Sequence, residues 1–389
     1  MRLPSPALKL GLFYAALYLS SGAGTPFIAP WFKAHGLSGT EIGVILAAPM
    51  LARLATGPIL AVWADGFRLR RTAILIMAGV SALGYGALMA LSGFWPWLLA
   101  WFIGATAFQI CPPLTDVITL RRAALQGFAY AIPRGIGSAA YILANVVGGL
   151  LLPKLGAGFV VEWLIGSGAL ILLGAFVLVP PDPVVEAGVH IDRRGRLAGA
   201  AALMAHPVFL LMLFSVSLVQ ATHAFYYAFS TLLWRSEGIA PGWSGALWGV
   251  GVGVEVIFLW FGEPFRRRLG PVGLLILGAA GAVVRWSLLA FSPTLWLLIP
   301  IQALHALTFS ATFVASLELT QRLSPRAHAS AAQALTAGLS MGVMSGFATL
   351  ASGPLYDHAG AWGYLVMAGV AALGLAGAIV LLRLNKVAA

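Results

Sequence analysis

Charged residues are scarce in this sequence. Only 9% of the 389 residues are charged, 60% are hydrophobic, and the mean hydropathy is +0.93. A water-soluble domain of this composition would expose most of its apolar surface, so that class is excluded. The composition indicates a polytopic membrane protein, and at about 20 apolar residues per span the chain has room for about twelve spans.

Cysteine is nearly absent. The single Cys111 lies in an apolar run beside Pro112 and Pro113, so no intrachain disulfide can form. The sequence also lacks an HExxH motif, a recognisable nucleophile motif around a serine, and a carboxylate pair at catalytic spacing. These absences argue against an intramembrane enzyme, and we expect no metal and no cofactor.

Basic residues outnumber acidic ones, with 23 Lys and Arg against 12 Asp and Glu. They lie mainly in short turns between apolar runs, which argues against nucleic acid as a partner. With both termini cytoplasmic, most of them fall on the cytoplasmic side, and only Lys33, Lys154 and Arg235 fall outside. Residues 1–9 lead into an apolar run that is followed by further spans, so we expect a retained first helix rather than a signal peptide.

The hydropathy pattern predicts an all-α polytopic membrane protein, with twelve transmembrane helices in two pseudo-symmetric six-helix halves. The longest polar stretch begins PPDPVVEAGVHIDRRGR and lies between the sixth and seventh spans. We therefore expect an N-terminal half over 1–180, a cytoplasmic linker over 181–205 and a C-terminal half over 206–389. The predicted spans cover residues 8–32, 40–64, 71–92, 95–119, 126–152, 160–180, 206–234, 241–265, 271–291, 294–320, 328–356 and 360–383.

Ionisable side chains occur inside several predicted spans, where they are costly unless they are paired or hydrated. Such residues are functional candidates by default, although a buried ion pair that only fixes helix register is the alternative. The candidates are Arg53, Asp116, Arg134, His223, Glu255, Arg285 and His305.

Polar residues recur at helical spacing on six of the spans, so they fall on one face of each helix. Stripes in both halves predict a central polar cavity, although single serines, threonines or tyrosines can equally join neighbouring helices. The stripes comprise Tyr14, Tyr18, Ser21 and Thr25; Gln109, Asp116 and Thr119; Tyr130, Arg134, Tyr141 and Asn145; Gln220, His223, Tyr227 and Ser230; Gln302, His305, Thr308 and Thr312; and Gln333, Thr336 and Ser340.

Two basic turns occupy corresponding positions in the two halves, GPILAVWADGFRLRR at 57–71 and GEPFRRRLG at 262–270. A basic turn between the second and third spans of each half is typical of an internally duplicated transporter. The first turn resembles the major facilitator loop pattern, with Asp65, Arg70 and Arg71 in place and three other positions changed.

Other segments resemble the proton-coupled major facilitator symporters grouped around phenylpropionate permeases, lactose permease and nucleoside permeases. These segments are GLSGTEIGVIL, ARLATGP, YAIPRGIGS, QALHALTF and SGPLYDHAG. The resemblance covers nearly the whole chain. It is specific to the superfamily and not to a substrate.

The resemblance to lactose permease implies a substrate site. Asp116 and Arg134 look like the acidic and basic sugar-binding pair of that protein, and Tyr141 falls where an aromatic ring stacks on the sugar. From the polar stripes we add four further substrate-binding candidates, which are Tyr18, His223, Tyr227 and Gln302.

The same resemblance implies a proton-coupling site made of Arg285 and His305. The chain departs from lactose permease at Thr308, where that protein has its proton-carrying carboxylate, and at Gln302, which replaces a Lys. Glu255 is the only carboxylate deep in the C-terminal half, so we take it as the candidate proton carrier. Movement of Arg285 relative to Glu255 would change the proton affinity of the carboxylate between states.

We therefore expect a secondary transporter that couples a small polar or aromatic solute (a sugar, a nucleoside or an aromatic acid) to protons by alternating access. A proton-driven drug or metabolite efflux antiporter is the alternative, and a non-transporting receptor or an intramembrane enzyme is less favoured. We expect Asp65 and Arg70 to form a conformational loop that does not touch the solute. The expected setting is a multi-pass monomer in the inner (plasma) membrane, with solute, protons and the lipid bilayer as its partners.

Overall fold

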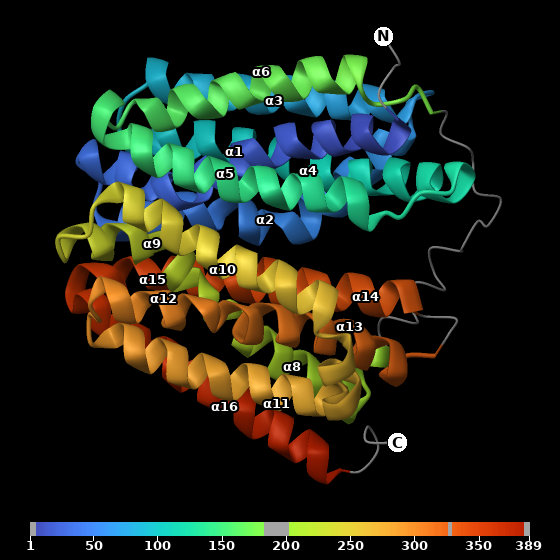
Figure 1. Ribbon diagram of the computed structural model, residues 1–389, viewed down its shortest axis with the longest axis vertical. Helices are drawn as coiled ribbons and strands as arrows, with labels where there is room; N and C mark the ends of the chain where they lie inside the picture. The colour runs from blue at the N-terminus through green and yellow to red at the C-terminus, as the bar shows by residue number, and fades with distance from the viewer. Residues whose placement is uncertain (1–4, 183–201, 326–328, 385–389) are drawn as a thin grey trace. The chain divides into compact units, whose positions relative to one another are not determined.

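The computed structural model describes residues 5–182, 202–325 and 329–384, which are almost entirely helical (Figure 1). The first six helices are α1 (Pro6–Ala34), α2 (Gly39–Asp65), α3 (Arg70–Ala90), α4 (Phe94–Gln126), α5 (Ala131–Leu155) and α6 (Phe159–Val177). After the linker come α8 (Pro207–Ala221), α9 (His223–Ser236), α10 (Pro241–Phe261), α11 (Glu263–Ala290), α12 (Leu295–Ala303), η1 (Ala306–Ala311), α13 (Thr312–Leu323), α14 (Ala329–Ala337), η3 (Gly338–Met344), α15 (Ser345–Ala359), η4 (Gly360–Trp362) and α16 (Gly363–Arg383).

The described residues contain twelve helical spans. Ten stretches are long and apolar enough to cross a membrane. One of them, Ala332–Arg383, includes the turn at Gly360–Trp362 and so holds two spans, and α1 adds another with its 29 residues. Counting the divided stretch as two spans and adding α1 to the other nine stretches gives twelve spans, the number that the sequence predicted.

The described chain forms two compact units. Unit 1 contains α1 to α6 together with the chain from Trp234 to Gly249, and unit 2 contains the remaining helices from α8 on. In unit 1, α1 packs against α5 and α6, and α3 packs against α4 and α6 (Figure 1). In unit 2, α16 packs against α8 and α11. Each unit has its own apolar core, which includes Phe13 and Ile118 in unit 1 and Phe209 and Leu275 in unit 2.

Small residues let α5 and the start of α10 approach closely inside unit 1. A Cβ atom added to Gly245 would collide with the backbone carbonyl of Asn145, and one added to Gly149 would collide with that of Pro241. Close approach at small residues is a common way for helices to associate in a membrane. This contact explains why the start of α10 belongs to unit 1.

The seventh, tenth and eleventh spans are interrupted rather than continuous. Thr222 separates α8 from α9, and the π-helical segments η1 and η3 interrupt the tenth and eleventh spans. Segments of π-helix are rare and occur often at functional sites, because they change which side chains share a face.

The second basic turn is helical in the structure. The sequence predicted a turn over 262–270, whereas α11 already begins at Glu263 and bends at Gly270, which has φ of 64°. Pro264 lies in the first turn of this segment, and Arg267 pairs with Glu263 at 2.5 Å across one helical turn. Both features favour helix, so the basic residues form a short helix that the kink at Gly270 separates from the span that follows.

Candidate functional site

In unit 1, Asp116 on α4 lies at the centre of a polar cluster. The hydroxyl of Tyr130, which precedes α5, donates to Asp116 Oδ1 at 2.8 Å, and the hydroxyl of Tyr14 on α1 donates to the same oxygen. Three helices therefore converge on one carboxylate. The sequence placed both tyrosines on polar stripes but did not include them among the site residues.

Arg134 on α5 lies over the ring faces of two tyrosines of α1. Its guanidinium carbon is 4.9 Å from the ring centre of Tyr18 and 5.5 Å from that of Tyr14. Such cation–π contacts stabilise a cation where little water is available. Because Tyr14 also donates to Asp116, it links the predicted pair Asp116 and Arg134 into one cluster.

A glycine of α5, Gly137, makes room for this arrangement. A Cβ atom added to Gly137 would lie 2.7 Å from the ring of Tyr18, so a larger residue there would displace the ring from beneath Arg134. Tyr141, seven residues beyond Arg134, lies on the same face of α5 and is half-buried. The predicted residues Tyr18, Arg134 and Tyr141 thus share one side of the α1–α5 pair.

In unit 2, Arg285 on α11 is fully buried and bonds only to neutral acceptors. Its Nη1 donates to His305 Nδ1 at 2.9 Å and to Thr308 Oγ1 at 3.1 Å, and its Nη2 donates to Gln302 Oε1 at 2.8 Å.

The donors around the cluster assign both histidine tautomers. An arginine can only donate, so His305 Nδ1 accepts and the proton of the neutral ring is on Nε2. This Nε2 lies 3.5 Å from Glu255 Oε2. His223 Nδ1 is 3.2 Å from the carbonyl of Gln220, so Nδ1 donates, and its Nε2 accepts from the hydroxyl of Thr308 at 3.0 Å. Both rings are neutral in this arrangement. Hydrogen bonds connect His305 to His223 through Arg285 and Thr308, and Glu255 lies beside His305 at the end of this series.

Aromatic rings enclose the Arg285 guanidinium. Its central carbon is 4.7 Å from the ring centres of both Tyr226 and Trp286. Trp286 is held in turn, because its indole N–H donates to Thr222 Oγ1 at 2.8 Å and its ring stacks on Tyr364. The sequence did not single out Tyr226 or Trp286, because neither belongs to a polar stripe.

The segment η1 brings the two acceptors of Arg285 Nη1 to one side of the tenth span. His305 precedes η1 and Thr308 lies within it, and the amide of Thr308 donates to the carbonyl of Leu304 at 2.9 Å. The structure places two predicted substrate-binding residues, His223 and Gln302, in this buried cluster. The third, Tyr227, is only half-buried, and its ring lies 6.3 Å from that of His305.

The predicted conformational loop is held by two ion pairs. Arg70 Nη1 lies 3.5 Å from Asp65 Oδ1, and the Arg70 amide donates to the carbonyl of Asp182 at 3.1 Å. The Asp182 carboxylate is buried and accepts from Arg122 Nε at 3.0 Å and also from Nη2. The first residues of the predicted linker are thus fixed to α3 and α4.

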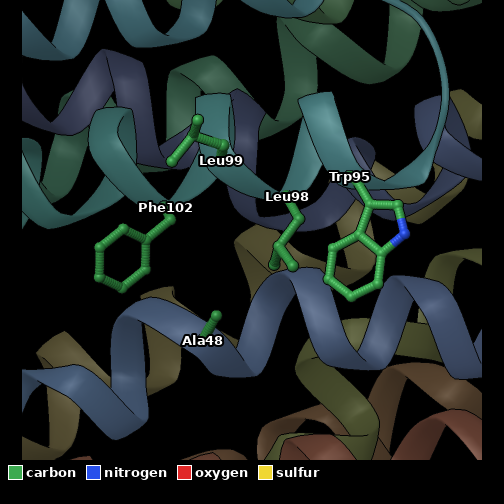
Figure 2. Close-up of a pocket in the computed structure, with 5 residues that line it drawn as sticks. All are labelled: Ala48, Trp95, Leu98, Leu99 and Phe102. Atoms are coloured by element: carbon green, nitrogen blue, oxygen red, sulfur yellow. The ribbon is translucent and has the colours of Figure 1, made fainter.

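Two cavities lie on either side of the ridge that Trp95 and Leu99 form on α4. One, of about 400 Å³, lies between α4 and Ala48 of α2 (Figure 2). The other, of about 610 Å³, lies between α3 and α4. Neither of these two cavities is lined by an ionisable residue, in contrast to the Asp116 and Arg285 clusters.

A polytopic helical bundle with ionisable clusters inside its spans is the architecture of a secondary transporter. Residues 7–366 match the MFS_1 like family, and the chain belongs to that family.

Two curated proteins and one solved structure show how close the similarity is. The probable 3-phenylpropionic acid transporter of Escherichia coli (strain K12) is 29% identical over 368 residues, which cover 93% of this chain and 94% of that protein. The uncharacterized transporter YwbF of Bacillus subtilis (strain 168) is 21% identical, over 96% of this chain and 92% of that protein. The crystal structure of nucleoside transporter NupG is 18% identical with a TM-score of 0.83, and the match covers 98% of this chain and 100% of that one.

These similarities confirm the predicted fold class, the major facilitator resemblance and the expectation of a transporter. The protein is a multi-pass secondary transporter of a small-molecule solute, and it belongs to a family of permeases rather than enzymes.

Proposed function

We propose that this transporter moves a small aromatic acid together with protons, in the same direction. The observation that carries this proposal is the chain of contacts from Glu255 through His305 to Arg285. Glu255 is partly exposed, with 21% of its side chain accessible, whereas Arg285 is fully buried. A proton can therefore reach Glu255 from water, and the resulting change in charge at Glu255 acts on the buried guanidinium of Arg285.

The coupling follows from the charges of this chain. With both histidines neutral, ionised Glu255 balances the single positive charge of Arg285. When Glu255 takes up a proton, the cluster is left with a net positive charge in a medium of low dielectric constant. An anionic solute then offsets that charge, so proton and solute favour each other's binding.

The cluster in unit 1 supports an aromatic acid as the solute. Arg134 supplies a planar donor that suits a carboxylate, and Tyr18 and Tyr141 supply ring faces on the same side of the α1–α5 pair. The E. coli relative is named as a probable transporter of 3-phenylpropionic acid, which has both a carboxylate and a ring. In our proposal Asp116 binds the solute together with Arg134 and is held by the hydroxyls of Tyr14 and Tyr130. His223, Tyr227 and Gln302 are the substrate-binding candidates of unit 2.

Alternating access would come from rocking of two six-helix halves, residues 1–180 and 206–389, about the solute site. In this proposal the Asp65–Arg70 pair stabilises one of the two states and does not contact the solute. The positive turns favour both termini in the cytoplasm. Our proposal also places the protein in the cell inner membrane as a monomer.

Proton flux in proteoliposomes tests the proposal. External 3-phenylpropionate, added without a pH gradient, should acidify the lumen faster than in protein-free liposomes. Arg134→Ala should lose both this acidification and solute binding. Alkalinisation of the lumen would indicate exchange of solute for protons, and normal binding by a well-folded Arg134→Ala protein would remove Arg134 from the site.

A further inference from the structure

Arg53 lies on the face of α2 that packs into unit 1. The residues 11 before and 11 after it, Ile42 and Ala64, are both buried, and so is Pro49, one turn before it. Eleven residues make about three turns of α-helix, so these side chains share one face. Val62 points to the opposite face and is 73% exposed. The outer surface of α2 is therefore the side of Val62, and Arg53 faces inward.

Arg53 is nevertheless exposed, and within the described residues its side chain makes no hydrogen bond and no ion pair. It lies 14 residues from Gly39 and 12 from Asp65, or about 21 Å and 18 Å at 1.5 Å per residue. The hydrocarbon core of a bilayer is about 30 Å thick, so Arg53 lies near its middle. An unpaired guanidinium at this depth requires water around it.

The surroundings of Arg53 leave room for a ligand. Gly57 follows it by one turn on the same face, and a Cβ atom added there would meet nothing within 4 Å. The helix against which α2 packs, α4, carries Asp116 of the unit 1 cluster. Arg53 and Asp116 therefore lie on two neighbouring helices of unit 1.

We propose that Arg53 lines a hydrated part of the solute path in unit 1 and binds the carboxylate of the solute in transit. A guanidinium without a protein partner presents all of its donors to an incoming anion. Arg53 thereby selects acids over neutral molecules of the same shape, in addition to Arg134. The inference that the solute is an anion rests on the proposed function, whereas the inference that water surrounds Arg53 does not.

Thiol labelling tests the hydration without any transport. Cys111 is buried and is the only cysteine, so Cys111→Ala gives a cysteine-free background. In that background Arg53→Cys should react with a charged methanethiosulfonate at least about tenfold faster than Ala55→Cys, which lies at the same depth on the other side of α2, because the reactive thiolate forms in water and not in lipid. Equal or slower reaction of Arg53→Cys would overturn the proposal.

Uptake kinetics test the selection of anions. For 3-phenylpropionate, Arg53→Gln should raise KM about tenfold or more with little change in kcat, as expected for loss of one charged hydrogen bond. Arg53→Lys should recover part of the affinity, and inhibition by the neutral 3-phenylpropionamide should not change. An equal loss for acid and amide, or an unchanged KM, would overturn the role in binding.

The two experiments separate this inference from the proposed function. If the wild-type protein carries no aromatic acid, the proposed function fails and Arg53 loses its role in binding that solute. Rapid labelling of Arg53→Cys would still show that a hydrated path passes the middle of α2.

Discussion

Thr308 is the residue at which the hydrogen bonds of the unit 2 cluster meet. Its hydroxyl accepts from Arg285 Nη1 and donates to His223 Nε2. It occupies the position where the resemblance to lactose permease leads one to expect a carboxylate. A hydroxyl there carries no charge, so the negative charge of the cluster is left to Glu255 alone.

Replacing Thr308 with valine keeps the branched shape and removes the hydroxyl. His223 Nε2 and one Arg285 donor then lose a partner in a fully buried place, which should cost about 1–3 kcal/mol of stability. Thermal unfolding of the purified protein should show a lower midpoint for Thr308→Val, whereas Thr308→Ser should stay near the wild type. Equal midpoints for the two variants would show that the hydroxyl does not hold the cluster together.

At the scale of elements, hydropathy predicted the spans well but missed where helices continue or break. The span predicted over 71–92 is α3, Arg70–Ala90. The one predicted over 95–119 continues to Gln126, because the polar residues after the apolar run remain helical until Gly127 ends α4 in the left-handed conformation. The segment η1 was not predictable, because a π-helical turn depends on contacts with other helices rather than on local composition.

Gly137 is the element-scale feature with the most direct consequence for the solute. In Gly137→Ala the new methyl group collides with the Tyr18 ring and moves it from beneath Arg134. The affinity for an aromatic acid should fall about tenfold, in line with loss of an interaction of about 1 kcal/mol or more. Binding can be followed by ligand-induced thermal shift. Gly166→Ala is the matched control, since a Cβ atom there meets nothing within 4 Å.

Unchanged affinity in Gly137→Ala would show that the position of the Tyr18 ring does not matter for the solute. An equal fall in Gly166→Ala would point to a general effect of alanine in these helices.

At the scale of the whole molecule, the sequence predicted the fold, and it predicted which charged residues lie inside the spans. The resemblance to lactose permease implied that Arg285 and His305 form a pair, and the structure joins them directly. Spacing could not show that Tyr226 and Trp286 enclose Arg285. Aromatic residues are common throughout membrane spans, and only packing reveals which of them lie against a cation.

The central claim is that Glu255 couples the solute to protons. Glu255→Gln keeps the shape of the side chain and removes its titration. Glu318→Gln is the control, because Glu318 is partly exposed and pairs only with Arg322 in the described residues.

The decisive measurement compares two modes of transport in the same proteoliposomes, uphill accumulation driven by a pH gradient and exchange of labelled for unlabelled solute. Glu255→Gln should lose the accumulation and keep the exchange, since exchange requires no proton release, while Glu318→Gln should keep both. Undiminished accumulation by Glu255→Gln would contradict the account, because the proton would then be carried by another residue.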